Sequence, residues 1–130
     1  MRTIEEKIID TLNGCNGEGL KNLSCRDRVL FYPNKVRYYL WNNLLFWSDA
    51  ENEYYFSALG WSTLTTKSRL NVILNAFFGA SITQKDYKWF LNWNNQNYSI
   101  NDTSMYCIKN NKLYKKSFES LSSLEEVKPL

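Results

Sequence analysis

The pattern of apolar positions at the start of the chain is helical. Apolar residues recur there at helical spacing: Ile4, Ile8, Ile9 and Leu12. This spacing predicts a short amphipathic helix of about ten residues. Thr3 and Glu6 have the spacing of a capping box at its start, and Gly14 favours its end. The glycine-bearing stretch 13–28 that follows predicts a loop.

From Val29 onward, apolar runs of strand length alternate with turn residues. Four such runs precede residue 60, and they span 29–32, 36–41, 44–47 and 53–59. Asn42 and Asn43 separate the second run from the third and favour a two-residue hairpin turn, because Asn tolerates a positive φ. The pattern predicts an antiparallel meander.

The helical period returns between residues 65 and 78. Its apolar residues again fall on one face: Leu70, Ile73, Leu74 and Phe77. We expect Thr65 or Thr66 to cap this helix, Gly79 to follow its end, and its apolar face to pack on the sheet.

The rest of the chain returns to strands. They are expected at 81–85, 87–93, about 98–100, about 105–108 and 112–115, with Asn–Asn turns at 94–95 and 110–111. The predicted class is α+β, an antiparallel meander with one amphipathic helix packed on it and a short N-terminal helix. Residues 1–116 are expected to form a single domain, and residues 117–130 a C-terminal tail or loosely docked segment.

The composition argues against catalysis and against metal binding. The chain has no histidine, which removes the commonest general base, and its three cysteines are scattered without a C-x-x-C spacing. Cys25 beside Arg26 is the remaining candidate nucleophile, and no base accompanies it. We therefore expect no enzyme activity, no metal ion and no cofactor. No signal peptide or membrane span is evident, so we expect a soluble protein of the cytoplasm with reduced thiols.

The charges are distributed unevenly along the chain. Residues 61–116 carry eight Lys or Arg against two Asp, whereas residues 1–60 carry seven against eight Asp or Glu. If the fold displays the middle segment on one face, that face would suit a phosphate-bearing partner or an acidic protein surface. The alternative is that these cations are spread over an ordinary solvated surface.

Two segments offer candidate binding residues. At the start of the second helix, free backbone N–H groups and nearby cations could hold an anion, or the same residues could merely cap the helix. In the strand that begins near residue 84, lysines alternate with rings that could stack on a nucleotide base or form the core of the sheet. The candidate residues are Thr65, Thr66, Lys67, Arg69, Asn71, Lys85, Tyr87, Lys88 and Trp89.

These two segments together resemble a small family of bacteriophage-encoded proteins of uncharacterised function. In that family a meander leads into a Gly-[Trp/Tyr]-x-Thr-x-Thr-Thr-[Lys/Arg]-x-Arg-[Leu/Ile]-Asn helix start, and a Gln-Lys-[Asn/Asp]-x-x-Trp-[Tyr/Phe] strand follows. The matching segments here are Gly60–Asn71 (GWSTLTTKSRLN) and Gln84–Phe90 (QKDYKWF). The resemblance covers roughly residues 28–92 and implies a phage or prophage source without an activity.

The leading hypothesis is therefore a non-catalytic phage accessory protein in the cytoplasm of the infected host. It would bind a host protein or protein–nucleic-acid complex of the nucleic-acid-handling or defence machinery, with an anti-CRISPR-like role as one case. The chain carries 21 aromatic residues, and Tyr and Trp are favoured anchors at protein interfaces. The alternative is direct binding of DNA or RNA by the basic segment 61–116, and a small enzyme is the third hypothesis.

Overall fold

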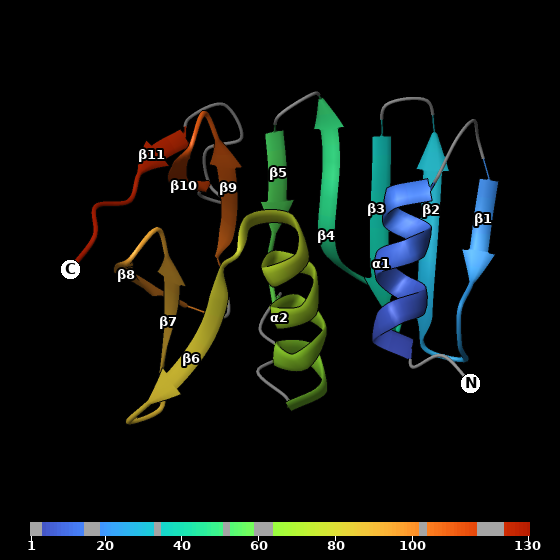
Figure 1. Cartoon of the computed structure of the whole chain (residues 1–130), viewed down its shortest axis with the longest axis horizontal. Helices are drawn as coiled ribbons and strands as arrows, with labels where there is room; N and C mark the ends of the chain where they lie inside the picture. The colour runs from blue at the N-terminus through green and yellow to red at the C-terminus, as the bar shows by residue number, and fades with distance from the viewer. Residues whose placement is uncertain are drawn as a thin grey trace.

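The computed structural model describes residues 4–14, 19–32, 35–50, 53–58, 64–101, 104–116 and 124–130. These residues form two helices and eleven strands (Figure 1). In chain order the elements are α1 (Ile4–Gly14), β1 (Gly19–Asn22), β2 (Asp27–Tyr32), β3 (Lys35–Leu40), β4 (Asn43–Ala50), β5 (Glu53–Phe56), α2 (Leu64–Phe78), β6 (Ser81–Lys85), β7 (Lys88–Trp93), β8 (Gln96–Ile100), β9 (Met105–Lys109), β10 (Lys112–Lys116) and β11 (Leu124–Glu126). The expected cap Thr3, Cys15 and the segment Gly60–Thr63 lie outside the described residues.

The strands form two antiparallel sheets. The large sheet has eight strands in the order β1-β2-β3-β4-β5-β9-β10-β11, and the small sheet has the order β6-β7-β8. β5 and β9 are neighbours, with Tyr54 opposite Ile108, although α2 and the whole small sheet lie between them in the sequence. Figure 1 shows both helices in front of the large sheet and the small sheet at the side of α2.

The expected α+β class, a meander with a helix packed on it, is wrong. The protein is a mostly antiparallel β structure with two short helices, and its strands do not form one continuous meander. The sequence pattern located most strands but treated neighbours in sequence as neighbours in space. β6, β7 and β8 form their own sheet, because β7 pairs with β6 and β8 and these three pair with no other described strand. The stretch 13–28, expected to be a loop, contains β1 and the start of β2.

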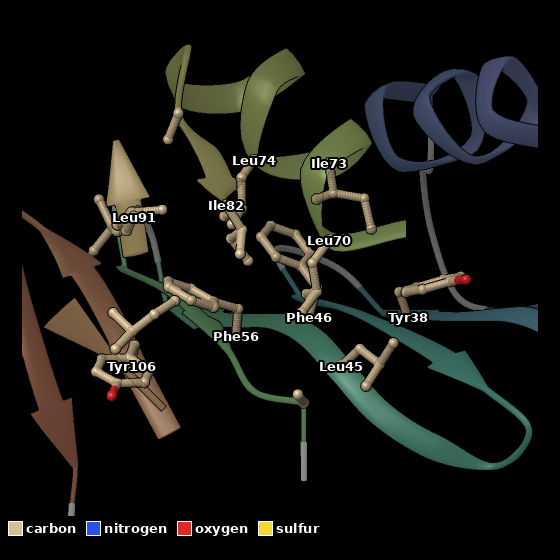
Figure 2. Close-up of a cluster of buried hydrophobic side chains, with 14 of the residues drawn as sticks. Tyr38, Leu45, Phe46, Phe56, Leu70, Ile73, Leu74, Ile82, Leu91 and Tyr106 are labelled. Carbon is tan, nitrogen blue, oxygen red and sulfur yellow. The ribbon is translucent and has the colours of Figure 1, made fainter. Parts of the chain in front are cut away.

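The hydrophobic core lies between the large sheet, the small sheet and the two helices. Figure 2 shows Leu70, Ile73 and Leu74 of α2 above Phe46 of β4, with Ile82 and Leu91 of the small sheet beside them. All six of these side chains are buried, and Phe77 is half-buried against the same core. The predicted apolar face of α2 therefore packs inward, as its spacing requires.

Strand pairing and two backbone hydrogen bonds attach the described C-terminal residues to the rest of the fold. β11 pairs with β10, and the backbone N–H of Val127 donates to the carbonyl oxygen of Leu113 at 2.9 Å. The N–H of Leu130 donates to the carbonyl oxygen of Asn97 at 2.7 Å, so the last described residue reaches the small sheet. In the part of the chain that the structure covers, neither helix has both the length and the apolar character needed to cross a lipid bilayer.

Candidate functional site

Most side chains of the expected anion grip at the start of α2 are buried or half-buried. The helix begins at Leu64, so Thr65 and Thr66 lie in its first turn, and the expectation that one of them is the N-cap is wrong. Thr66 is buried, and Thr65 and Lys67 are half-buried. These side chains are therefore turned largely towards the fold, and the Lys67 side chain is partly exposed to solvent.

Arg69 is buried in an ion pair with Asp27 of β2. Its Nε lies 2.9 Å from the Asp27 Oδ1, and its second guanidinium nitrogen donates to Oδ2 at 3.4 Å. The hydroxyls of Tyr38 and Ser24 also donate to this carboxylate, from Ser24 at 2.6 Å. Asp27 is 1% exposed and Arg69 is 5% exposed. The alternative prediction, in which Arg69 is a cation on the solvated surface, is therefore wrong.

The negative charge of Asp27 is compensated by the groups that donate hydrogen bonds to it within this buried network. Burial alone would raise the pKa of Asp27, but the hydrogen bonds from Arg69, Ser24 and Tyr38 outweigh it and hold this pKa below its usual value. Burial and the adjacent Asp27 carboxylate raise the pKa of Tyr38. The network thus joins α2, β2 and β3 and commits the Arg69 charge to the interior of the fold.

Asn71 fastens α2 to the small sheet. Its side-chain amide nitrogen donates to the carbonyl oxygen of Ile82 at 3.1 Å, and its amide oxygen accepts the N–H of Ile82. Because both of these groups are committed to β6, Asn71 positions the small sheet against the helix. Its proposed role in ligand binding stays a prediction that these contacts do not support.

The β6–β7 hairpin tip (Lys85–Lys88) is the most exposed of the candidate segments. Tyr87 is 97% exposed, and Asp86 and Tyr87 form the turn with φ values of 53° and 63°. Lys85 and Lys88 lie directly opposite each other across the hairpin. Like charges in this position repel, and a ring at positive φ is strained, so the tip combines two unfavourable features.

A shallow hollow of about 310 Å³ adjoins this hairpin tip. Its lining residues come from all three strands of the small sheet and their connections: Gln84, Tyr87, Lys88, Trp89, Ser99, Ile100 and Asn101. Three of the predicted binding residues therefore lie together here. Trp89 itself is 5% exposed, because alternation along β7 turns it towards the core with Leu91 and Trp93. Tyr87 and Lys88 are the accessible candidate residues of the hollow, and Lys85 is exposed beside it.

The large sheet carries a second surface that the sequence analysis missed. In the large sheet, the residues alternating with the core side chains point away from both helices, towards what we call the open face. One row of cross-strand partners runs over this face from β1 to β11. We call it the central row, and it consists of Leu20, Leu30, Arg37, Trp47, Tyr55, Cys107, Tyr114 and Glu126.

Aromatic rings occupy the middle of the central row. Trp47 and Tyr55 are stacked, with ring centroids 5.4 Å apart and an angle of 8° between planes. The ammonium group of Lys116 lies 5.7 Å from the centroid of the Tyr55 ring, in a cation–π arrangement. Burial, together with the neighbouring Cys107 and Glu53, raises the pKa of Tyr55 to about 12. The ring hydroxyl therefore stays neutral and a hydrogen-bond donor at physiological pH.

The residues of the open face can be recognised in the sequence, because they recur at every second position of a strand. Cations and rings alternate with core residues in several strands, as in Lys35-x-Arg37-x-Tyr39 of β3 and Lys112-x-Tyr114-x-Lys116 of β10. What the sequence could not supply is the pairing of β5 with β9. That pairing brings Tyr55 next to β9 and β10 and joins separate strands into one surface.

The cations of residues 61–116 do not lie together on one face, as the prediction of a basic face required. Arg69 is buried, Lys85 and Lys88 lie at the hairpin tip, and Lys109 forms a 2.7 Å ion pair with Glu53. Lys112 lies 3.9 Å from Glu126 on the same open face. Among the described residues, no group of three or more Cys, Asp or Glu side chains is arranged to hold a metal ion.

Comparison with known proteins identifies a family. Residues 1–119 match the family model described as Kyanoviridae Gp96 protein, and that range covers most of the chain. No curated protein and no solved structure matches. The phage source that the helix-start and strand motifs implied agrees with this result. The chain therefore belongs to the Kyanoviridae Gp96 protein family, a family of phage-encoded proteins.

Proposed function

We propose that this protein is a non-catalytic phage accessory protein that acts by binding a host factor in the cytoplasm of the infected cell. The partner is a protein of the nucleic-acid-handling or defence machinery, alone or with its nucleic acid, and inhibition of a CRISPR effector is one case. Family membership supports the phage setting, and the histidine-free sequence supports binding over catalysis.

The observation that carries the proposal is the hairpin tip of β6 and β7. A fully solvated tyrosine gains little from its ring in the free protein, and its positive φ costs about 1–2 kcal/mol. Strained, exposed side chains of this kind are concentrated at functional sites. Tyr87 would enter a pocket of the partner, and Lys85 and Lys88 would meet an acidic rim that relieves their repulsion.

A comparison of hairpin variants tests this proposal. The wild-type protein and the triple variant Lys85→Gln, Tyr87→Gly, Lys88→Gln are immobilised and exposed to host lysate. We expect the wild type to retain one host protein in near-stoichiometric amount and the variant to retain less than about a tenth of it, because anchor residues contribute about 2 kcal/mol or more. The matched control is Asn95→Gly in the neighbouring β7–β8 turn, which should bind as the wild type does.

Two results would count against the hairpin. One is the absence of any stoichiometric partner while circular dichroism shows the wild-type protein folded. The other is equal retention of the same host protein by the wild type and the triple variant.

Direct nucleic-acid binding is the second candidate, but the basic segment 61–116 is not its best-supported surface. The buried Arg69 and the ion-paired Lys109 and Lys112 reduce what that segment offers to phosphates. The open face of the large sheet favours this function instead.

A further inference from the structure

We propose that the open face of the large sheet binds single-stranded nucleic acid, with the rings of the central row as the stacking platform. Trp47 would stack on a base through the ring face that Tyr55 does not cover, and the cations around the pair would meet phosphates. This inference is independent of the hairpin contact proposed above, because the two surfaces belong to different sheets.

The described rings on the open face are all Tyr or Trp, whereas the core face carries both Phe and Tyr. The described aromatic side chains on this face are Tyr32, which is exposed, and Tyr39, Trp47, Tyr55 and Tyr114, which are half-buried. The core face of the same sheet carries Phe31, Phe46 and Phe56 together with Tyr38, Tyr54 and Tyr106. Tyr and Trp combine a flat apolar surface with a hydrogen-bonding group, so they suit a surface that is wet when free. Their faces stack on any base, which gives binding with little sequence preference.

The charge of the open face is positive. Its described cations are Arg28, Lys35, Arg37, Lys109, Lys112 and Lys116, against the two acids Glu53 and Glu126. Both acids are paired with lysines at the β9–β10 end of the sheet. The cations of β2 and β3 on one side of the rings, and Lys116 on the other, would follow the phosphates of a strand laid over the row.

The shape of the face favours a single strand over a duplex. Eight strands spaced about 4.8 Å apart make a surface roughly 34 Å wide, which cannot enter a major groove about 12 Å wide. In a duplex the bases are already stacked on each other, so their faces are closed to protein rings. An extended single strand offers both its bases and its phosphates to such a sheet.

Fluorescence anisotropy with labelled oligothymidine, oligouridine and a duplex of the same length tests the inference. We expect the single strands to bind and the duplex to bind at least about tenfold more weakly. Between about 50 and 200 mM salt the affinity should fall steeply, with a log–log slope near −0.7 for each neutralised phosphate. The ring variant Trp47→Thr, Tyr55→Thr should bind at least about tenfold more weakly, because stacking of each base on a ring supplies a substantial share of the affinity.

A charge variant and a hairpin variant complete the experiment. Lys35→Gln, Lys116→Gln keeps the rings and should make the salt slope shallower by about 0.7 for each phosphate that the variant no longer neutralises. The triple hairpin variant should bind oligonucleotides as the wild type does. All variants are first compared with the wild type by circular dichroism and thermal melting, and the charge variant keeps the inference testable if the ring variant does not fold.

Three results would overturn the inference. Oligonucleotide binding that survives in the ring and charge variants but disappears in the hairpin variant would assign it to the small sheet. Stronger binding of the duplex would exclude the stacking platform. Absence of binding at low salt by the folded wild-type protein would also overturn it. Dimerisation that Trp47→Thr, Tyr55→Thr abolishes, measured by sedimentation, would then assign the face to a second copy of the chain.

Discussion

The carboxylate of Asp27 lies in the interior, where β2, β3 and α2 meet. It receives hydrogen bonds from Arg69, Tyr38 and Ser24, so its charge is compensated by protein groups. Arg69 is 42 residues from Asp27 in the sequence, and its neighbours Lys67 and Ser68 are both more exposed. A local pattern cannot show which cation of a helix start turns inward, because the answer depends on where β2 is placed.

Breaking this pair should destabilise the protein strongly. Asp27→Asn leaves the Arg69 charge buried beside a neutral amide, and the loss of one partner of a buried pair costs about 3–5 kcal/mol. Urea denaturation followed by circular dichroism measures the change. Glu126→Gln, which removes an exposed pair with Lys112, should have little effect. If both variants unfold at the same urea concentration as the wild type, Asp27 has no such role.

The Asp27 carboxylate should make the free energy of unfolding depend on pH in the acid range. The folded-state pKa of Asp27 lies below its ordinary value of 3.8, so folding is favoured by its ionisation at pH values above 3.8. As the pH falls below this value and through the folded-state pKa, the contribution is lost. Unfolding free energies measured from neutral pH to about 2 should decline less in Asp27→Asn than in the wild type. Equal slopes for the two proteins would assign the acid sensitivity to other groups.

At the scale of elements, the hairpin turns fall into two groups. The β7–β8 and β9–β10 turns use Asn94–Asn95 and Asn110–Asn111, and Asn adopts positive φ readily. The β3–β4 turn uses Trp41–Asn42, with Trp41 60% exposed, and the β6–β7 turn uses Asp86–Tyr87. The second group therefore places an aromatic residue at a left-handed backbone position that local geometry disfavours.

Replacing the strained tyrosine should stabilise the free protein. Tyr87→Gly removes a side chain from a left-handed position that Gly adopts without strain, and it should raise the free energy of unfolding by about 1 kcal/mol. Chemical denaturation measures this change, with Asn95→Gly as the matched control and a smaller expected gain. A variant that is more stable yet binds its partner less well would separate the two roles of the turn. Loss of stability in Tyr87→Gly would show instead that the ring supports the fold.

Much of the secondary structure is predictable from local pattern, and the assembly of elements is not. The apolar spacing of α2 and the Asn–Asn turns locate a helix and two hairpins because these signals act over a few residues. The β3–β4 turn lies at Trp41–Asn42, one residue earlier than the expected Asn42–Asn43. Of the candidate binding residues, Tyr87, Lys85 and Lys88 are accessible, whereas Arg69 and Asn71 serve the fold through partners distant in sequence.

At the scale of the whole molecule, Cys107 reports on the integrity of the large sheet. It is fully buried in the central row between Tyr55 and Tyr114, and burial raises the pKa of its thiol. In a Cys15→Ser background, a thiol reagent should modify the exposed Cys25 quickly and Cys107 only after the sheet opens. Mass spectrometry of timed samples gives both rates. Equal rates in the folded protein would mean that the rings do not shield this thiol.

The pairing of β5 with β9 has a consequence for how the chain is made. While a ribosome is still synthesising α2 and the small sheet, β1 to β5 are already available to form hairpins with one another. The edge of β5 that later pairs with β9 then has no neighbour, and its backbone N–H and C=O groups are unpaired. An exposed strand edge of this kind can pair with other nascent chains. The interval before β9 emerges should therefore be the period when this protein is most prone to aggregate, and slower translation of residues 64–104 would lengthen it.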